Sequence, residues 1–166
     1  MEVNWHKLKD MTKKDIGKIP KVPGIYFVRW SRDDCPVPIN RITGTDQKGI
    51  LYIGRSENIR SRIRKIYNAI INNKRGHTIY KTIVFCGTSK IVKLEEYEIT
   101  WEELGTINES EAQEWAAIKT YCDKYNEPPP LNLMISRELF ATFGLAVFGK
   151  SKFASEPDDF VKSIIF

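Results

Sequence analysis

The alternation of apolar and polar side chains along the chain predicts three strands. Residues 25–30 follow the turn sequence of residues 18–24 and are rich in β-branched and aromatic side chains, and residues 49–54 form a second short apolar run. Across residues 96–101 polar and apolar side chains alternate, as expected of a strand with one buried face. Residues 31–48 contain two prolines and balanced charge, which favours a long excursion between the first two strands over a tight hairpin.

Helical periodicity appears in two places. Residues 57–73 carry one narrow apolar stripe, because four isoleucines recur at positions i, i+4, i+7 and i+11: Ile59, Ile63, Ile66 and Ile70. A second helix is predicted to begin at Asn108 and to end before Pro128. Residues 78–85 fit either a helix or a strand.

The composition indicates one domain with an extension at each end. A chain of 166 residues is long enough to bury a core, and residues 1–21 and 134–166 are expected to form an N-terminal lead and a C-terminal appendage that packs on the domain. Three scattered cysteines and two isolated histidines argue against a zinc finger, a disulfide framework and a histidine-based metal centre. The N-terminal sequence lacks the apolar core of a secretion signal, and the longest apolar run, residues 139–148, is too short to cross a bilayer. We therefore expect a cytoplasmic protein without a membrane partner.

Charge is more informative locally than over the whole chain, whose net charge is only +5. Residues 55–75 are strongly basic, whereas residues 94–114 contain glutamates and no lysine or arginine. On a helical wheel Arg60 and Arg64 point away from the isoleucine stripe, and a solvated face is their plain interpretation. Arg62 lies at the edge of the stripe, where a guanidinium needs an acceptor such as a phosphate.

The second helix raises a similar question about its glutamates. Asn108 and Glu111 have the spacing of an N-x-x-E capping box, which gives Glu111 a structural role. Glu114 has no such role and is expected at the edge of the packed face, beside Trp115. A plain surface glutamate is the alternative for this position.

Two tripeptides, Gly24-Ile25-Tyr26 and Tyr52-Ile53-Gly54, resemble the paired signatures of the GIY-YIG nucleases. Four further residues resemble the family's motifs in order and spacing: Arg55, Arg62, Glu114 and Asn132. The resemblance covers residues 22–133 and leaves residues 31–48 as an insertion between the two signatures. It implies an α+β domain in which helices flank a small three-stranded antiparallel sheet.

The function that the resemblance implies is endonucleolytic hydrolysis of DNA phosphodiester bonds with Mg²⁺ or Mn²⁺, in restriction or in repair. Glu114 would be the metal ligand, and Arg62 would bind the scissile phosphate and stabilise charge in the transition state. Tyr26 and Tyr52 would line the same face, and one of them would activate the attacking water once nearby cations lower its pKa; we favour Tyr26 as the general base, with Tyr52 as the alternative. His77 resembles a histidine that some family members use in proton transfer; an exposed loop histidine is the alternative.

Five side chains are expected at the substrate: Arg55, Arg60, Arg64, Lys65 and Asn132. Asn132 would brace the site by hydrogen bonding, and a plain turn residue after the prolines is its alternative. The partner is then DNA, the protein would associate with the nucleoid when bound to it, and a palindromic target would favour a homodimer.

Two rival hypotheses stay open at this stage. A nucleic-acid-binding module of the same fold without catalysis would lack the glutamate or the arginine, and the sequence has both. An unrelated α+β domain would not bring Tyr26, Tyr52, Arg62 and Glu114 into one cleft.

Overall fold

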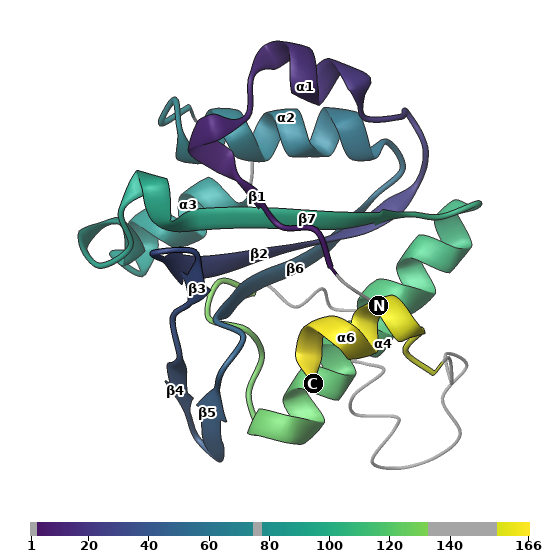
Figure 1. Ribbon diagram of the computed structural model, residues 1–166. Helices are drawn as coiled ribbons and strands as arrows, with labels where there is room; N and C mark the ends of the chain where they lie inside the picture. Colours follow the sequence, from purple (N-terminus) through teal and green to yellow (C-terminus); the bar gives the residue numbers. More distant parts are fainter. Residues whose placement is uncertain (1–2, 75–77, 133–155) are drawn as a thin grey trace.

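A computed structural model describes residues 3–74, 78–132 and 156–166 of the chain, which form a mixed α+β structure around an antiparallel sheet (Figure 1). The central strand is β2 (Gly24–Arg32), which pairs with β7 (Tyr97–Glu103) on one side and with β6 (Ile50–Ser56) on the other. These are the three predicted strands. Because successive side chains of a strand point to opposite faces of the sheet, each strand can pack against a layer of helices on both faces.

The sheet nevertheless has five strands, so the predicted number was wrong. β1 (His6–Lys7) pairs with β7, and β3 (Cys35–Pro36) pairs with the end of β2. Asp33 and Asp34 both have positive φ, which allows a tight two-residue turn between β2 and β3. The connection from β2 to β6 is nevertheless the long excursion that its composition favoured, and the turn at Asp33 and Asp34 lies within it. Strands of two residues are too short to produce a periodic signal.

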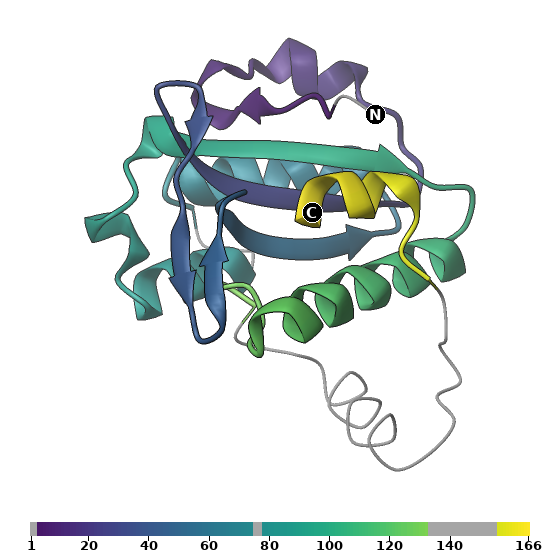
Figure 2. The same cartoon turned by 60° about the horizontal axis from the view of Figure 1, so that its bottom comes forward.

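Helices cover both faces of the sheet. α1 (Lys13–Lys18) and α2 (Ile59–Ile70) lie on one face, and α4 (Ile107–Tyr125) and α6 (Asp159–Ile165) lie together on the other (Figures 1 and 2). The ambiguous segment is a helix, α3 (Thr78–Phe85), which packs against α2. Three short 3₁₀ helices complete the described elements: Leu8–Asp10, Thr88–Lys90 and Leu94–Glu96.

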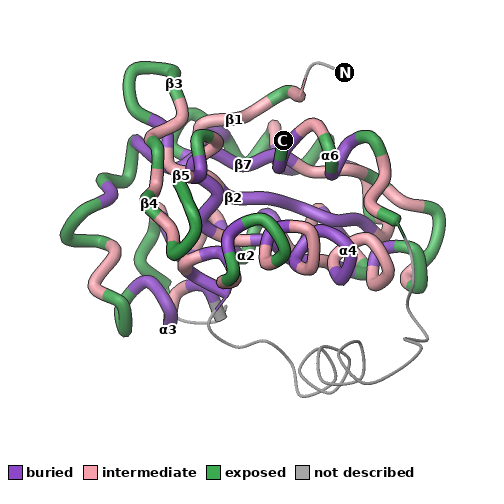
Figure 3. The backbone as a smooth tube through the Cα atoms, turned by 90° about the horizontal axis from the view of Figure 1, so that it is seen from below, coloured by how far each residue is buried: buried purple, intermediate pink, exposed green. Residues whose placement is uncertain are grey.

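Two apolar cores follow from the alternation along β2, which is buried over most of its length (Figure 3). Ile25 and Phe27 pack with α4 and α6, whereas Tyr26 and Val28 face the layer of α2. The isoleucine stripe predicted for α2 is confirmed, because all four side chains are buried there. α6 contributes Phe160 and its apolar neighbours to the other core, so the described end of the appendage packs on the domain.

The N-terminus of α4 differs from the prediction. The N-cap is Thr106, whose hydroxyl accepts from the Glu109 backbone N–H while the Glu109 carboxylate accepts from the Thr106 N–H. The capping box is therefore Thr106–Glu109, not Asn108–Glu111, because the helix begins at Ile107. Glu111 therefore does not cap the helix, contrary to the prediction.

The rest of the insertion forms a two-stranded ribbon, β4 (Ile39–Arg41) and β5 (Gly44–Asp46), which projects from the sheet (Figure 1). Arg41 binds the chain just after α4 through the Pro128 carbonyl at 2.6 Å and the Glu127 carboxylate at 3.0 Å. The buried Asp46 carboxylate accepts from the Tyr121 hydroxyl at 3.0 Å. The ribbon is thus fixed to the C-terminal end of α4. Among the described residues, no helix combines the length and apolarity that a bilayer crossing requires.

Candidate active site

A cleft of about 460 Å³ opens where β6 ends and α2 begins, and α4 closes its far side. Four of the predicted catalytic side chains line it together, one each from β2, β6, α2 and α4: Tyr26, Tyr52, Arg62 and Glu114. The hypothesis of an unrelated domain predicted that these residues would lie apart, and they do not. Arg55 and Lys65 also line the cleft.

The glycine of the second tripeptide has a steric role in this arrangement. Tyr26 lies directly opposite Gly54 in the antiparallel pair of β2 and β6, and Tyr52 lies on the same face two residues earlier. The two rings stack with centroids 5.9 Å apart. A Cβ atom at Gly54 would come within 2.6 Å of Tyr26 Cζ and 2.7 Å of Tyr52 Cε1. Only a glycine leaves room for the stacked tyrosines.

Gly24 of the first tripeptide also has a steric role, toward β7 on the other side of β2. A Cβ atom there would collide with the carbonyl oxygen of Glu102 on β7. Backbone atoms in a paired strand cannot move aside as a flexible side chain can, so a larger residue would push β2 and β7 apart. Gly24 therefore allows the close approach of β2 and β7, and Gly54 leaves room for the ring of Tyr26 beside β6.

The two tyrosines differ in exposure. Tyr26 is fully buried, and its hydroxyl oxygen has no hydrogen-bond partner of normal geometry among the described residues. Tyr52 is half-buried and faces the cleft. Burial raises the pKa of Tyr26 well above its usual value, and the nearby Tyr52 raises it further while Arg62 lowers it. Burial likewise raises the pKa of Tyr52. The expected lowering of tyrosine pKa by cations is thus outweighed by burial.

Glu114 is held in place by a neighbouring guanidinium. Arg55 Nε lies 3.1 Å from Glu114 Oε2, and Arg55 Nη2 lies 2.9 Å from Glu111 Oε1. Only 20% of the Glu114 side chain is exposed. Burial raises the pKa of the Glu114 carboxyl to about 7, against the opposing effects of Arg55 and Arg62. The carboxyl therefore titrates near neutral pH, as groups in functional sites often do.

The donor set of the cleft fits a hard cation. Glu114 and the exposed Glu57 supply carboxylate oxygens, and the described residues contain no group of three or more His, Cys, Asp or Glu side chains that could enclose a metal ion. Mg²⁺ commonly binds through one or two carboxylates and takes its other ligands from water and substrate phosphate. The cleft also has three cations, Arg55, Arg62 and Lys65, which favour an anionic ligand.

Three of the predicted substrate-binding side chains lie elsewhere. The Arg60 guanidinium donates to the Ile19 carbonyl and so holds the N-terminal segment on α2. Arg64 is exposed on α2 but does not line the cleft. The buried Asn132 side chain accepts from the Ile53 N–H at 2.9 Å and donates to the Ile53 carbonyl at 2.8 Å.

Asn132 thus replaces a neighbouring strand along the outer edge of β6. This favours the bracing role for Asn132, because both polar atoms of its buried amide bind the backbone of β6, and contact with substrate stays a prediction. His77 lies outside the described residues, between α2 and α3.

Several residues of the cleft were not predicted. Glu111 holds Arg55, and its contact joins residues 56 positions apart, which no local pattern reveals. The end of β6, the connection after it and the first turn of α2 contribute four more lining residues: Ser56, Glu57, Asn58 and Ser61. Asn58 is the N-cap and accepts from the Ser61 N–H at 3.0 Å. An asparagine immediately before the isoleucine stripe is a capping signal that the sequence contained.

Comparisons of the chain with protein-family models, with curated proteins and with solved structures found no match.

Proposed function

We propose that the chain is a divalent-metal-dependent endonuclease of the GIY-YIG type, which hydrolyses DNA phosphodiester bonds in the cleft at the end of β6. The observation that carries the proposal is the convergence of Tyr26, Tyr52, Arg62 and Glu114, from four different elements, on one cleft. The two motif glycines support it, since each has a steric reason to be glycine in this arrangement.

The cations of the cleft would bind the scissile phosphate. Arg62 projects from the first turn of α2, and its planar guanidinium can hold two phosphate oxygens at once. Lys65 lies about one turn further along the same helix and would contact a neighbouring phosphate. Charge that develops on the phosphate oxygens would then be stabilised by groups that are already in position.

Glu114 would hold Mg²⁺ or Mn²⁺. When bound, the ion supplies Lewis-acid activation of the phosphate and stabilises the leaving oxygen. Glu114 can serve as a ligand only when it is ionised, and its Oε2, which is 3.1 Å from the Arg55 guanidinium, would have to be released before it could bind the ion. Glu111 would retain Arg55 after this release, since it binds a different nitrogen of the same side chain.

The exposure of the tyrosines favours Tyr52 over Tyr26 as the residue that contacts the attacking water. Both line the cleft, but Tyr52 is half-buried and accessible from it, whereas Tyr26 is fully buried in its wall. Both phenols have raised pKa values and keep their protons at neutral pH. The pair would therefore orient water by hydrogen bonds, and the role of Tyr26 as general base is revised to that of a residue which positions Tyr52.

The proposal is tested by incubating the purified protein with supercoiled plasmid and with branched DNA, in Mg²⁺, Mn²⁺ or EDTA. Glu114→Gln should abolish cutting, and Arg62→Gln should reduce the rate by about a hundredfold or more because a phosphate ligand is lost. Glu95→Gln, at an exposed position outside the cleft, is the matched control and should cut normally.

Three outcomes are distinguishable. Metal-dependent cutting that only the cleft variants lose would support the proposal, and the fragment pattern would separate restriction from repair. Equal cutting by Glu114→Gln would contradict the assigned metal ligand. Salt-sensitive DNA binding without any cutting would favour a nucleic-acid-binding module.

A further inference from the structure

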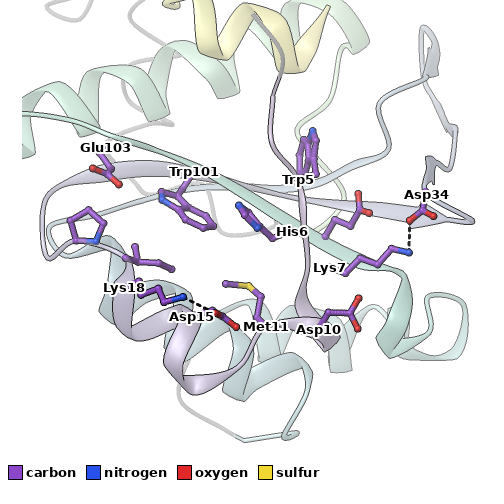
Figure 4. A pocket seen from close by; sticks show the side chains of 13 residues that line it. Trp5, His6, Lys7, Asp10, Met11, Asp15, Lys18, Asp34, Trp101 and Glu103 are labelled. Atoms are coloured by element: carbon purple, nitrogen blue, oxygen red, sulfur yellow. Dashed lines mark ion pairs between the residues drawn. The ribbon is translucent and has the colours of Figure 1, made fainter.

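A second cavity lies on the side of the sheet that carries the N-terminal segment. It measures about 690 Å³ and is bounded by β7 on one side and by β1, the 3₁₀ helix Leu8–Asp10 and α1 on the other (Figure 4). We call this cavity the N-terminal groove. None of its lining residues belongs to the proposed catalytic cleft, so the two sites are separate surfaces of the molecule.

The N-terminal groove has an aromatic wall. His6 of β1 and Trp101 of β7 stack with ring centroids 4.8 Å apart and an angle of 24° between the planes. Both side chains are only half-buried. Met11 and Ile19 extend the apolar surface toward α1. Such a wall offers contact area to a flat or apolar group of a ligand.

The charge of the N-terminal groove is negative. Five carboxylates line it, against two lysines: Asp10, Asp15, Asp34, Glu98 and Glu103, with Lys7 and Lys18. Three of these carboxylates already have ion pairs, namely Asp15 with Lys18, Asp34 with Lys7 and Glu98 with Arg29.

Asp10 and Glu103 form no ion pair with any residue in the described part of the chain. Figure 4 shows them toward opposite ends of the groove, with the His6–Trp101 pair between them. The groove therefore combines a flat aromatic centre with one unneutralised carboxylate on either side.

We infer that the N-terminal groove binds an arginine-bearing peptide segment of a partner protein. A guanidinium is flat, weakly hydrated and always charged, so it can pack against the aromatic wall of His6 and Trp101 and also pair with a carboxylate at the end of the groove. An ammonium group has no flat face for the aromatic wall. DNA is disfavoured because its phosphates would meet this negative charge, in contrast to the cleft with Arg55, Arg62 and Lys65. The inference does not depend on the proposed nuclease activity.

The test uses the whole chain and a blocked peptide, acetyl-Gly-Arg-Gly-Arg-Gly-amide, with its citrulline counterpart as the uncharged control of the same shape. The indole N–H resonances are followed by NMR, and Trp101→Phe assigns the Trp101 signal. The double variant Asp10→Asn/Glu103→Gln should weaken binding of the arginine peptide by roughly tenfold, because two exposed charge partners are lost. The double variant Glu95→Gln/Glu156→Gln removes two exposed carboxylates elsewhere and should bind normally.

The expected result is a salt-sensitive shift of the Trp101 signal with the arginine peptide and none with citrulline. Equal binding of the citrulline peptide, no shift at millimolar peptide, or a shift of the same signal with a single-stranded oligothymidine would each overturn the inference. Glu114→Gln should leave peptide binding unchanged, so a failure of the nuclease proposal would not be mistaken for a failure of this one.

Discussion

Arg55 Nε lies 3.1 Å from Glu114 Oε2, so the carboxylate proposed to hold a metal ion is neutralised by a guanidinium in the described structure. The same guanidinium is held by Glu111 at 2.9 Å. An arginine between two glutamates one helical turn apart can remain bound to one while it leaves the other. The ion pair between Arg55 and Glu114 can therefore break while Arg55 stays bound to Glu111.

The buried position of Glu114 has a cost that depends on pH. Its pKa in the folded protein is about 7, above the usual value of 4.5. The folded state thus binds the proton more tightly than the unfolded state, and stability is lost as pH rises from about 4.5 to about 7. Glu114→Gln should raise the free energy of unfolding, by on the order of 2 kcal/mol more at pH 8 than at pH 5.

Urea unfolding of the two proteins at both pH values measures this difference. Glu95→Gln, at an exposed position, should show no pH-dependent gain. A gain for Glu114→Gln of the same size at pH 5 and pH 8 would mean that the carboxyl of Glu114 does not titrate between them.

The same titration should control metal binding at Glu114. A proton and a divalent cation compete for one carboxylate. Because the pKa of Glu114 is about 7, the proton increasingly displaces the cation as the pH falls below that value. The affinity for Mn²⁺ should therefore fall by about tenfold between pH 8 and pH 6. Electron paramagnetic resonance of free Mn²⁺ measures the affinity, and Glu114→Gln should remove the site. An affinity independent of pH would exclude Glu114 as the titrating ligand.

The stacked tyrosines should depend on the absence of a side chain at Gly54. Gly54→Ala places a methyl group within 2.7 Å of Tyr52 Cε1, and we expect it to lower the free energy of unfolding by about 2 kcal/mol and to abolish activity. Near-ultraviolet circular dichroism and urea unfolding would follow the loss of the stack.

Gly17→Ala is the matched control for this substitution. A Cβ atom at Gly17, in α1, would meet no atom within 4 Å, so alanine should raise stability by about 0.5 kcal/mol. If Gly54→Ala behaved in the same way as Gly17→Ala, the tyrosines would not be in contact in solution.

The sequence was sufficient to predict the elements that have a clear periodic pattern of apolar residues. Ile59, Ile63, Ile66 and Ile70 predicted α2 because a helix returns every 3.6 residues to the same face, and alternation predicted β7 in the same way. β1 and β3 have two residues each, which is a single period and too short for an alternation to be recognised. Residues 78–85 gave no distinct period, and their packing on α2 decides that they are helical.

The candidate site was predictable to the extent that it follows motifs. The two tripeptides located the tyrosines, but nothing local showed that Arg55 would bind Glu111 or that Arg60 would bind the Ile19 carbonyl. The fold brings these partners together across 56 and 41 positions. Cationic side chains near a predicted phosphate site were therefore all assigned to the substrate, although some of them hold the protein together.

Asn132 shows the same point and gives the last prediction. Its amide satisfies both the N–H and the carbonyl of Ile53, 79 positions away, along the edge of β6 that pairs with no strand of the described residues. Asn132→Ala leaves two buried backbone groups without a partner and should lower the free energy of unfolding by on the order of 2 kcal/mol. It should also accelerate hydrogen exchange at the backbone amide of Ile53, the residue of β6 that follows Tyr52. Asn72→Ala, which removes an exposed hydrogen bond to Asn68, is the control and should change neither quantity appreciably. If exchange at Ile53 were unchanged while DNA binding weakened, Asn132 would contact the substrate directly and the bracing role would be wrong.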